Sequence, residues 1–123
     1  MEDKVPKLNI EGVGEFNVES GTRLVLALSD NIADNVHACG GFARCTTCQV
    51  EFMDGEPQKC TRAELDVLKR KNKLGDFRLA CQSVVDQDMH VRVLMKFSDS
   101  GRPDPGPRPE ADITPDPQWT QTP

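Results

Sequence analysis

The stretch HACGGFARCTTCQVEF (residues 37–52) decides how the rest of the chain is interpreted, because it places Cys39, Cys45 and Cys48 within ten residues. Glycines follow the first cysteine, and an alternation of apolar residues begins only at Val50. Such a loop is too polar and too rich in glycine to bury its thiols as packing groups. The pattern therefore indicates a loop of thiol ligands that leads directly into a β-strand.

The composition of the chain narrows the class of protein. It has 123 residues and a net charge of -5, which suits one domain plus an appendage and argues against non-specific nucleic-acid binding. The N-terminal MEDKVPKLNIEG lacks the apolar core of a secretory signal, and no apolar run approaches the roughly 20 residues of a membrane span. We therefore expect a cytoplasmic protein with no membrane partner and no nucleic-acid partner.

The expected compartment bears on the five cysteines of the chain. In a reducing cytoplasm, clustered thiols are more often metal ligands or redox groups than disulfides. An odd number of cysteines also excludes complete disulfide pairing within one chain. The cysteines therefore point to a metal or redox site.

The sequence pattern of residues 7–32 predicts a hairpin followed by a helix. Residues 7–10 and 15–19 have strand character and are joined by EGVG, a short link with two glycines. Residues 21–32 carry apolar side chains at helical spacing, and we expect Thr22 to be the N-cap of this helix.

The next part predicts two further strands and a short second helix. Apolar residues alternate over residues 48–53 and 89–97, which is the period of a strand. Between them, Thr61 and Glu64 have the spacing of a capping box, which predicts a helix that begins at Thr61 and ends near Gly75. Together these elements predict an α+β domain with one modest core.

The composition changes after Phe97, since seven of the nine prolines fall in residues 98–123. Regular helix and central strand are excluded there. We therefore divide the chain into a domain of residues 1–97 and a Pro-rich C-terminal tail. Two interpretations of the tail stay open. Either it is flexible and truncation after Phe97 leaves the site intact, or Ile113 and Trp119 anchor it to the body or to a partner.

A fourth cysteine would complete a tetrathiolate site with the three of the loop. Cys81 precedes the last predicted strand, and Cys60 precedes the second helix. Structural zinc usually takes its ligands as two close pairs, whereas a [2Fe–2S] cluster needs four thiolates, two on each iron. Three ligands from one loop and one distant ligand fit the cluster better. Cys60 is also suited to packing on Leu65 as a hydrophobic staple at the start of the helix.

The residues between the loop cysteines suit a centre that contains inorganic sulfide. Gly40 and Gly41 allow the backbone to wrap closely, so that its N–H groups can reach the sulfides. Thr46 and Thr47 add short hydroxyls, and Arg44 adds a cation. Hydrogen bonds and nearby charges of this kind set the reduction potential of a cluster.

These features together resemble the [2Fe–2S] ferredoxins. The spacing C-x5-C-x2-C is one residue longer than the plant-type spacing. It is similar to that of the adrenodoxin-like and bacterial assembly-type ferredoxins, as are HAC, CTTC and RLACQ. The resemblance covers about residues 5–97. It implies a β-grasp (ubiquitin-like) fold with a mixed sheet, one main helix, a cluster-binding loop and a short second helix.

The resemblance also implies a cofactor and its ligands. The cluster would be bound by Cys39, Cys45, Cys48 and Cys81, with Cys60 outside the set. The residues implied to contact the cofactor beside these ligands are Gly40, Gly41, Arg44 and Thr47.

The function implied by the resemblance is that of a soluble one-electron carrier, not an enzyme. It would take electrons from a ferredoxin reductase and pass them to an acceptor such as a monooxygenase or an Fe–S assembly enzyme. Two alternatives stay open. One is a redox-sensing or adaptor module that uses the Pro-rich tail as its binding segment, and the other is a structural zinc-binding domain.

Overall fold

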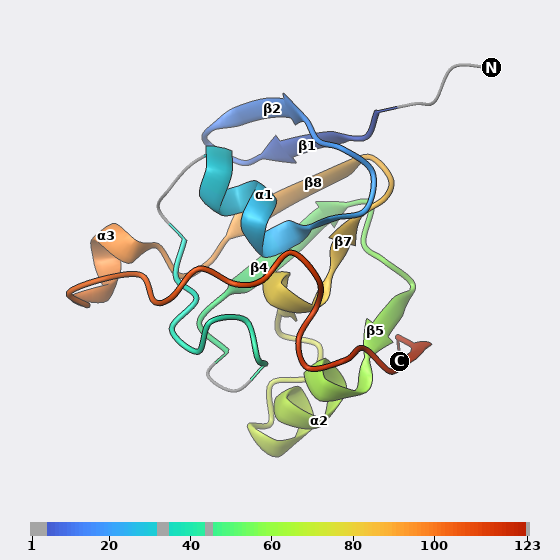
Figure 1. The fold of residues 1–123 in the computed structure, drawn as a ribbon, viewed down its shortest axis with the longest axis vertical. Coiled ribbons are helices and arrows are strands. Elements are labelled where there is room, and N and C mark those ends of the chain that lie inside the picture. The colour runs from blue at the N-terminus through green and yellow to red at the C-terminus, as the bar shows by residue number, and fades with distance from the viewer. Residues whose placement is uncertain (1–4, 32–34, 44–45, 123) are drawn as a thin grey trace.

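The central element of the fold is a five-stranded mixed sheet with the strand order β2-β1-β8-β4-β6 (Figure 1). The computed structural model describes residues 5–31, 35–43 and 46–122. β1 is antiparallel to β2 and parallel to β8, while β4 is antiparallel to both β6 and β8. This mixed sheet confirms the α+β class, and the β1–β2 pairing confirms the predicted hairpin. The five strands are β1 (Lys7–Ile10), β2 (Gly14–Asn17), β4 (Gln49–Asp54), β6 (Arg78–Leu79) and β8 (Met89–Val93).

Smaller elements surround the sheet. Two short antiparallel pairs, β3 with β7 and β5 with β9, lie outside it. The helices are α1 (Leu24–Asn31), α2 (Arg62–Arg70), α3 (Phe97–Ser100) and the 3-10 turn η1 (Ala80–Gln82), and the short strands are β3 (Thr22–Arg23), β5 (Lys59–Thr61), β7 (Val84–Val85) and β9 (Trp119–Gln121).

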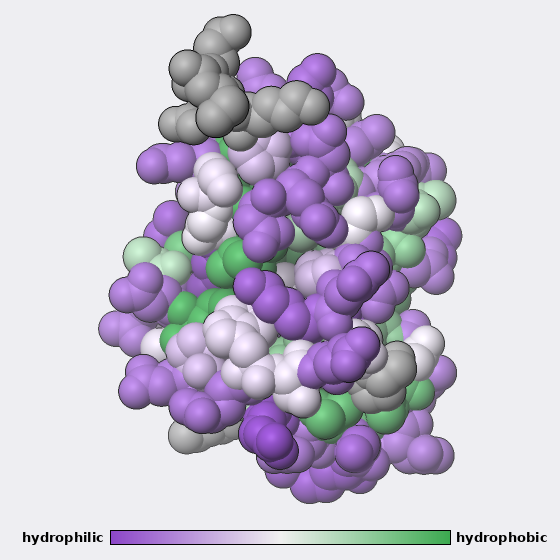
Figure 2. Space-filling model, turned by 90° about the vertical axis from the view of Figure 1, so that its right-hand side faces the viewer, coloured by the Kyte–Doolittle hydropathy of each residue, from purple (hydrophilic) through white to green (hydrophobic). Residues whose placement is uncertain are grey.

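The core lies between α1 and the sheet. Leu24 and Leu28 of α1 are almost fully buried, as are Ile10, Val50 and Val91 of the sheet. The face seen in Figure 2 is mostly hydrophilic, with small and separate hydrophobic areas. No helix within the described ranges has the length and apolar character needed to cross a membrane.

The prediction that Thr22 caps the first helix is wrong. Thr22 lies in β3 opposite Val85, and its hydroxyl donates to the carbonyl of Glu19 at 2.7 Å. The helix begins only at Leu24, because the pairing of β3 with β7 holds the two preceding residues extended. This pairing is a long-range contact that helical periodicity cannot reveal.

The second helix begins as predicted but ends earlier. Thr61 is its N-cap, since the Thr61 hydroxyl accepts from the backbone N–H of Glu64 at 3.1 Å. The carboxylate of Glu64 accepts instead from the guanidinium of Arg78. The helix ends at Arg70 and not near Gly75, because Asn72 already has the left-handed φ of 58°.

Two strands are shorter than predicted. β2 ends at Asn17, and β8 ends at Val93 because the chain then turns into α3 (Phe97–Ser100). The exclusion of helix from residues 98–123 is therefore wrong at the start of this segment, which precedes its first proline, Pro103. Within β8 the predicted alternation holds, since Met89, Val91 and Val93 are all buried.

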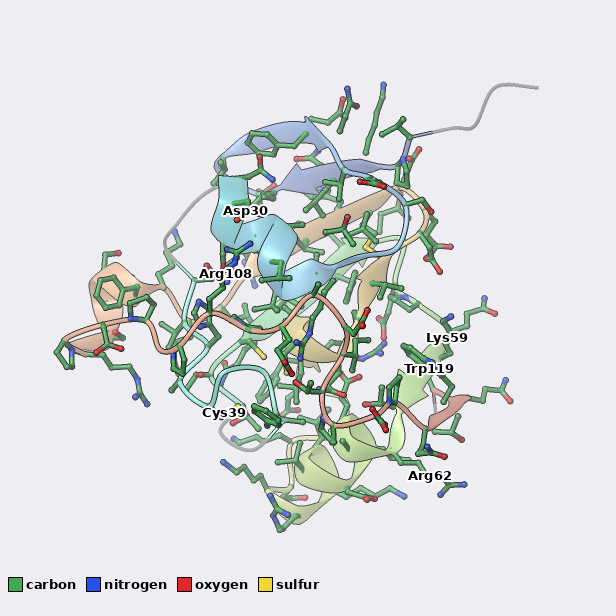
Figure 3. All side chains as sticks on the ribbon, in the orientation of Figure 1. Asp30, Cys39, Lys59, Arg62, Arg108 and Trp119 are labelled. Atoms are coloured by element: carbon green, nitrogen blue, oxygen red, sulfur yellow. The ribbon has the colours of Figure 1, made fainter. Side chains whose placement is uncertain are left out.

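The C-terminal segment packs against the body of the protein. In Figure 1 it runs from α3 past the loop and α1 towards β5. The backbone N–H of His37 donates to the carbonyl of Pro105 at 2.8 Å. Figure 3 shows Arg108 beside Asp30 of α1, with 2.9 Å between Nη1 and Oδ1. Residues of the tail therefore contact both the loop and the first helix.

The two predicted anchor residues of the tail differ in burial. Ile113 is 7% exposed, so it is anchored in the body. Trp119 is 40% exposed and lies in β9, where the Lys59 ammonium is 4.5 Å from its ring centroid (Figure 3). The anchored interpretation of the tail therefore describes this structure.

Candidate metal centre

The pairing of β4 with β6 brings two distant cysteines together. Gln49 lies opposite Leu79, so Cys48 and Cys81 flank the same end of this strand pair. The backbone N–H of Ala80 donates to the carbonyl of Cys48 at 2.9 Å. Both cysteine side chains are buried and share a hydrogen bond. The register of the β4–β6 pair thus places the Cys48 thiol of the loop beside the Cys81 thiol of η1.

The surroundings of Cys81 favour its thiolate. The hydrogen bond with Cys48 is the main cause that lowers the pKa of the Cys81 thiol, while burial acts in the opposite direction. Gln82 donates its Nε2–H to the Cys81 sulfur at 3.6 Å, and the charge of Arg23 adds to the lowering. Because the thiolate is the metal-binding form of cysteine, Cys81 is suited to be a ligand.

Arg23 places a buried cation at this site, although the sequence analysis did not single it out. Its side chain is 1% exposed, and it donates to the carbonyls of Cys81 and Gly41. Burial lowers the pKa of Arg23, whereas the nearby thiolates of Cys81, Cys48 and Cys39 act in the opposite direction. Three of the four predicted ligands therefore lie within electrostatic reach of one guanidinium.

The loop has the close wrapping expected of its glycines. Gly40 and Gly41 have φ values of 72° and 93°, in the left-handed region that favours glycine. A Cβ on Gly41 would also lie 2.6 Å from Nη2 of Arg23. Thr47 closes the loop, because its hydroxyl accepts from the backbone N–H of Ala38 at 2.9 Å. The loop therefore positions its cysteines through backbone shape and one side-chain bond.

Two of the predicted site residues, Arg44 and Cys45, lie outside the described residues. Cys60 lies apart from the site in β5, where it is 3% exposed and burial raises the pKa of its thiol. Within the described part of the chain, no three His, Cys, Asp or Glu side chains converge as ligands of a single ion. The four-cysteine ligand set thus stays a prediction.

Gln82 is a second site residue that was not predicted. Its side chain is fully buried, and Nε2 donates to the carbonyl of Thr114 at 2.9 Å and to that of Gly41 at 3.3 Å. Its Oε1 accepts from the Thr61 hydroxyl at 2.6 Å. Gln82 therefore connects η1 with the loop, the tail and the start of α2. Its place in the RLACQ motif was the only signal in the sequence.

The residues present fit a [2Fe–2S] cluster. Such a cluster carries negative charge on its sulfides and thiolates, which must be offset by hydrogen-bond donors and cations. Here the thiols of Cys39, Cys48 and Cys81 lie near the buried Arg23, and an amide donor reaches the Cys81 sulfur.

Comparison with known proteins agrees with this chemistry. Residues 8–86 match a family model described as 2Fe-2S iron-sulfur cluster binding domain. A component of the Na(+)-translocating NADH-quinone reductase of Methylococcus capsulatus is 34% identical over 84 residues, which are 68% of this chain and 20% of that protein. The corresponding component in Pseudomonas paraeruginosa is 34% identical over 86 residues, or 70% of this chain and 21% of that protein. The chain thus spans about a fifth of the length of these relatives.

Solved structures give the same fold. The ISC-like [2Fe–2S] ferredoxin FdxB of Pseudomonas putida superposes with a TM-score of 0.59 at 26% identity, covering 72% of this chain and 91% of that one. The ferredoxin reductase in carbazole 1,9a-dioxygenase superposes with a TM-score of 0.54 at 23% identity, covering 76% of this chain and 29% of that one, and shows the fold alone. Since the family match covers more than half of its length, the chain belongs to the 2Fe-2S iron-sulfur cluster binding domain family, a family of electron-transfer domains that bind a [2Fe–2S] cluster.

Proposed function

We propose that this chain is a one-electron carrier, which shuttles electrons from a reductase to an acceptor enzyme. The cluster would be bound by Cys39, Cys45, Cys48 and Cys81. The observation that carries the proposal is the contact between the Cys48 and Cys81 thiols. These two cysteines lie far apart in the sequence, and the β4–β6 register brings them together. The superposition on the FdxB ferredoxin, with a TM-score of 0.59 at 26% identity, supports a carrier.

The arrangement suggests a division of roles among the ligands. When bound, the cluster accepts and returns one electron. Because the thiols of Cys48 and Cys81 are in contact, we assign them to one iron, which leaves Cys39 and Cys45 for the other. Residues of the chain would hold these thiolates in place and offset their charge. Thr47 would keep the loop closed through its bond to Ala38.

The proposed partners are redox proteins, and the chain itself would catalyse no reaction. They are a ferredoxin reductase and an acceptor such as a monooxygenase or an Fe–S assembly enzyme. Cys39 is partly exposed and Phe42 is 39% exposed, whereas Cys48 and Cys81 are buried. The loop side of the cluster is therefore where an electron would enter and leave. In this proposal residues 1–97 form the ferredoxin domain, and the tail of residues 98–123 packs on it.

The experiment that tests this function is a redox titration of the full chain, purified without oxygen. Iron, inorganic sulfide and zinc are counted, and the visible spectrum is followed during reduction and reoxidation. We expect a red-brown protein that contains iron and sulfide in equal amounts and bleaches reversibly with one electron. A colourless protein that contains zinc would contradict the proposal.

A second assay separates a carrier from an adaptor module. Reductase-dependent reduction of a cytochrome through the chain is expected for a carrier. An adaptor would instead bind a non-redox partner through its tail and would give no such turnover.

A further inference from the structure

Arg23 is a buried cation that is held by neutral groups. None of the ion pairs found among the described residues includes it. A buried charge is strongly unfavourable unless it meets an opposite charge. The guanidinium donates to the carbonyls of Cys81 at 2.8 Å, Glu110 at 2.9 Å, Asp112 at 3.1 Å and Gly41, and to the hydroxyl of Thr114 at 3.4 Å.

The opposite charge that this cation needs is available from the cysteine thiolates. Cys81, Cys48 and Cys39 all interact electrostatically with Arg23. A cluster bound by four thiolates has a net negative charge, and reduction makes that charge more negative. A fixed cation beside it therefore favours the reduced state over the oxidised state.

We propose that Arg23 is the buried counter-ion of the iron–sulfur cluster and that the tail segment of residues 105–114 holds it in position. By favouring the reduced state, Arg23 raises the reduction potential of the cluster. The proposal rests on the ligand set of the proposed function and adds to it a residue from outside the cysteine loop.

The tail segment fits closely over the loop beside Arg23. A Cβ on Gly106 would collide with the carbonyl oxygen of His37, and a Cβ on Gly41 would lie 2.9 Å from Cβ of Pro109. Glu110 and Asp112 offer backbone carbonyls to the guanidinium. By excluding water, this cover lowers the local dielectric constant and strengthens the interaction of Arg23 with nearby negative charge.

A purely structural role for Arg23 can be separated from a counter-ion role. A residue that only connects the tail to the loop needs hydrogen-bond donors, whereas a counter-ion needs a positive charge. Arg23→Gln keeps amide donors and loses the charge, while Arg23→Lys keeps the charge and has fewer donors. Arg92→Gln is the matched control, because Arg92 is an exposed arginine of β8 that pairs with Glu51 and lies outside the tail segment.

The test measures the midpoint potential of the cluster-loaded full chain and these three variants. We expect R23Q to lower the ratio of reduced to oxidised protein at fixed applied potential at least tenfold, which is about 59 mV for a one-electron couple. R23K and R92Q should stay within about threefold of the wild type, because R23K retains the charge and R92Q removes a screened one. Loss of the cluster from R23Q alone, with R23K near the wild type, would equally support the proposal.

Three results would overturn the counter-ion role. These are unchanged potentials in both Arg23 variants, equal shifts in R23K and R23Q, and loss of the cluster from both of these variants. The first would show that the charge has no effect, and the other two that geometry matters more than charge. The iron and sulfide content and the reversible reduction of the wild-type chain test the proposed function separately.

Discussion

Replacing Glu64 should destabilise the fold strongly, because Glu64 is the buried partner of a buried arginine. Its carboxylate is 1% exposed and accepts from Arg78 Nε at 2.9 Å, from Arg78 Nη2 at 3.2 Å and from the backbone N–H of Leu79 at 2.8 Å. Burial lowers the pKa of Arg78, but the hydrogen bonds and charges of Glu64 and Glu56 outweigh burial and raise it overall. The pair fixes β6, the strand that leads into Cys81.

The size of the effect follows from what Glu64→Ala leaves behind. Removing one member of a buried ion pair typically costs about 3–5 kcal/mol. Arg78 keeps its contact with Glu56 at 3.1 Å, which reduces the loss, while the unpaired N–H of Leu79 adds about 1–3 kcal/mol. We therefore expect the free energy of unfolding to fall by about 4 kcal/mol. Glu64→Gln keeps one acceptor for Leu79 but also removes the charge that pairs with Arg78, so it should cost about 2–3 kcal/mol.

The assay is urea unfolding of the cluster-loaded chain without oxygen, followed by circular dichroism and by visible absorbance. With a slope of about 1.5 kcal/mol/M, a loss of 4 kcal/mol lowers the urea midpoint by about 2–3 M. If the two signals separate, unfolding is not two-state, and half-lives in fixed urea are compared instead.

The control for Glu64→Ala is a variant that breaks an exposed ion pair. Arg92 contacts Glu51 at 2.8 Å with both side chains about half exposed, so Arg92→Gln should cost less than about 1 kcal/mol. If Glu64→Ala costs no more than Arg92→Gln, the argument from burial is refuted.

Three further predictions concern the cysteines and the tail. Cys81→Ser should abolish or strongly alter the visible spectrum, while Cys60→Ser should leave it nearly intact; the reverse outcome would exchange their roles. Truncation after Phe97 removes the tail that covers the loop, including the buried Ile113. Contrary to the expectation for a flexible tail, we therefore predict that the visible absorbance of the cluster is lost faster. An unchanged half-life of this absorbance would contradict the prediction. Burial raises the pKa of Cys60, so the folded state keeps this thiol protonated while the unfolded chain ionises near its ordinary pKa of about 8.5. The stability that the protonated Cys60 thiol contributes is therefore fully present below about pH 8.5 and is lost as the pH rises through the pKa of this thiol in the folded state. Mass spectrometry should accordingly find alkylation of Cys60 at about pH 8 much faster in urea than in the folded chain, and equal rates would contradict its burial.

Local patterns in the sequence were sufficient to predict the parts of the site that depend on neighbouring residues. The loop spacing and its two glycines are such features, and Gly40 and Gly41 have the backbone that their type predicts. The capping residue Thr61 is another, because an N-cap involves only residues of the same turn. The family match then confirmed the cofactor that this local pattern indicated.

The missed residues depend on contacts between distant parts of the chain. Arg23 lies next to the apolar run of α1 and would ordinarily be solvated, but the β3–β7 pairing places it beside η1, where the loop and the tail also contact it. Gln82 needs the tail residue Thr114 and the loop residue Gly41 as acceptors. Periodicity and capping rules describe short windows, so they carry no information about these partners.

The tail therefore changes how the cysteine loop is understood. The loop supplies thiols and backbone shape, but the cation beside them is fixed by carbonyls of Glu110 and Asp112, far along the chain from Arg23. If charge and dielectric constant set the potential of the cluster, then a grafted copy of the loop on another scaffold would bind iron without reproducing that potential. Composition alone assigned the proline-rich segment to an appendage, whereas its backbone forms part of the environment of the site.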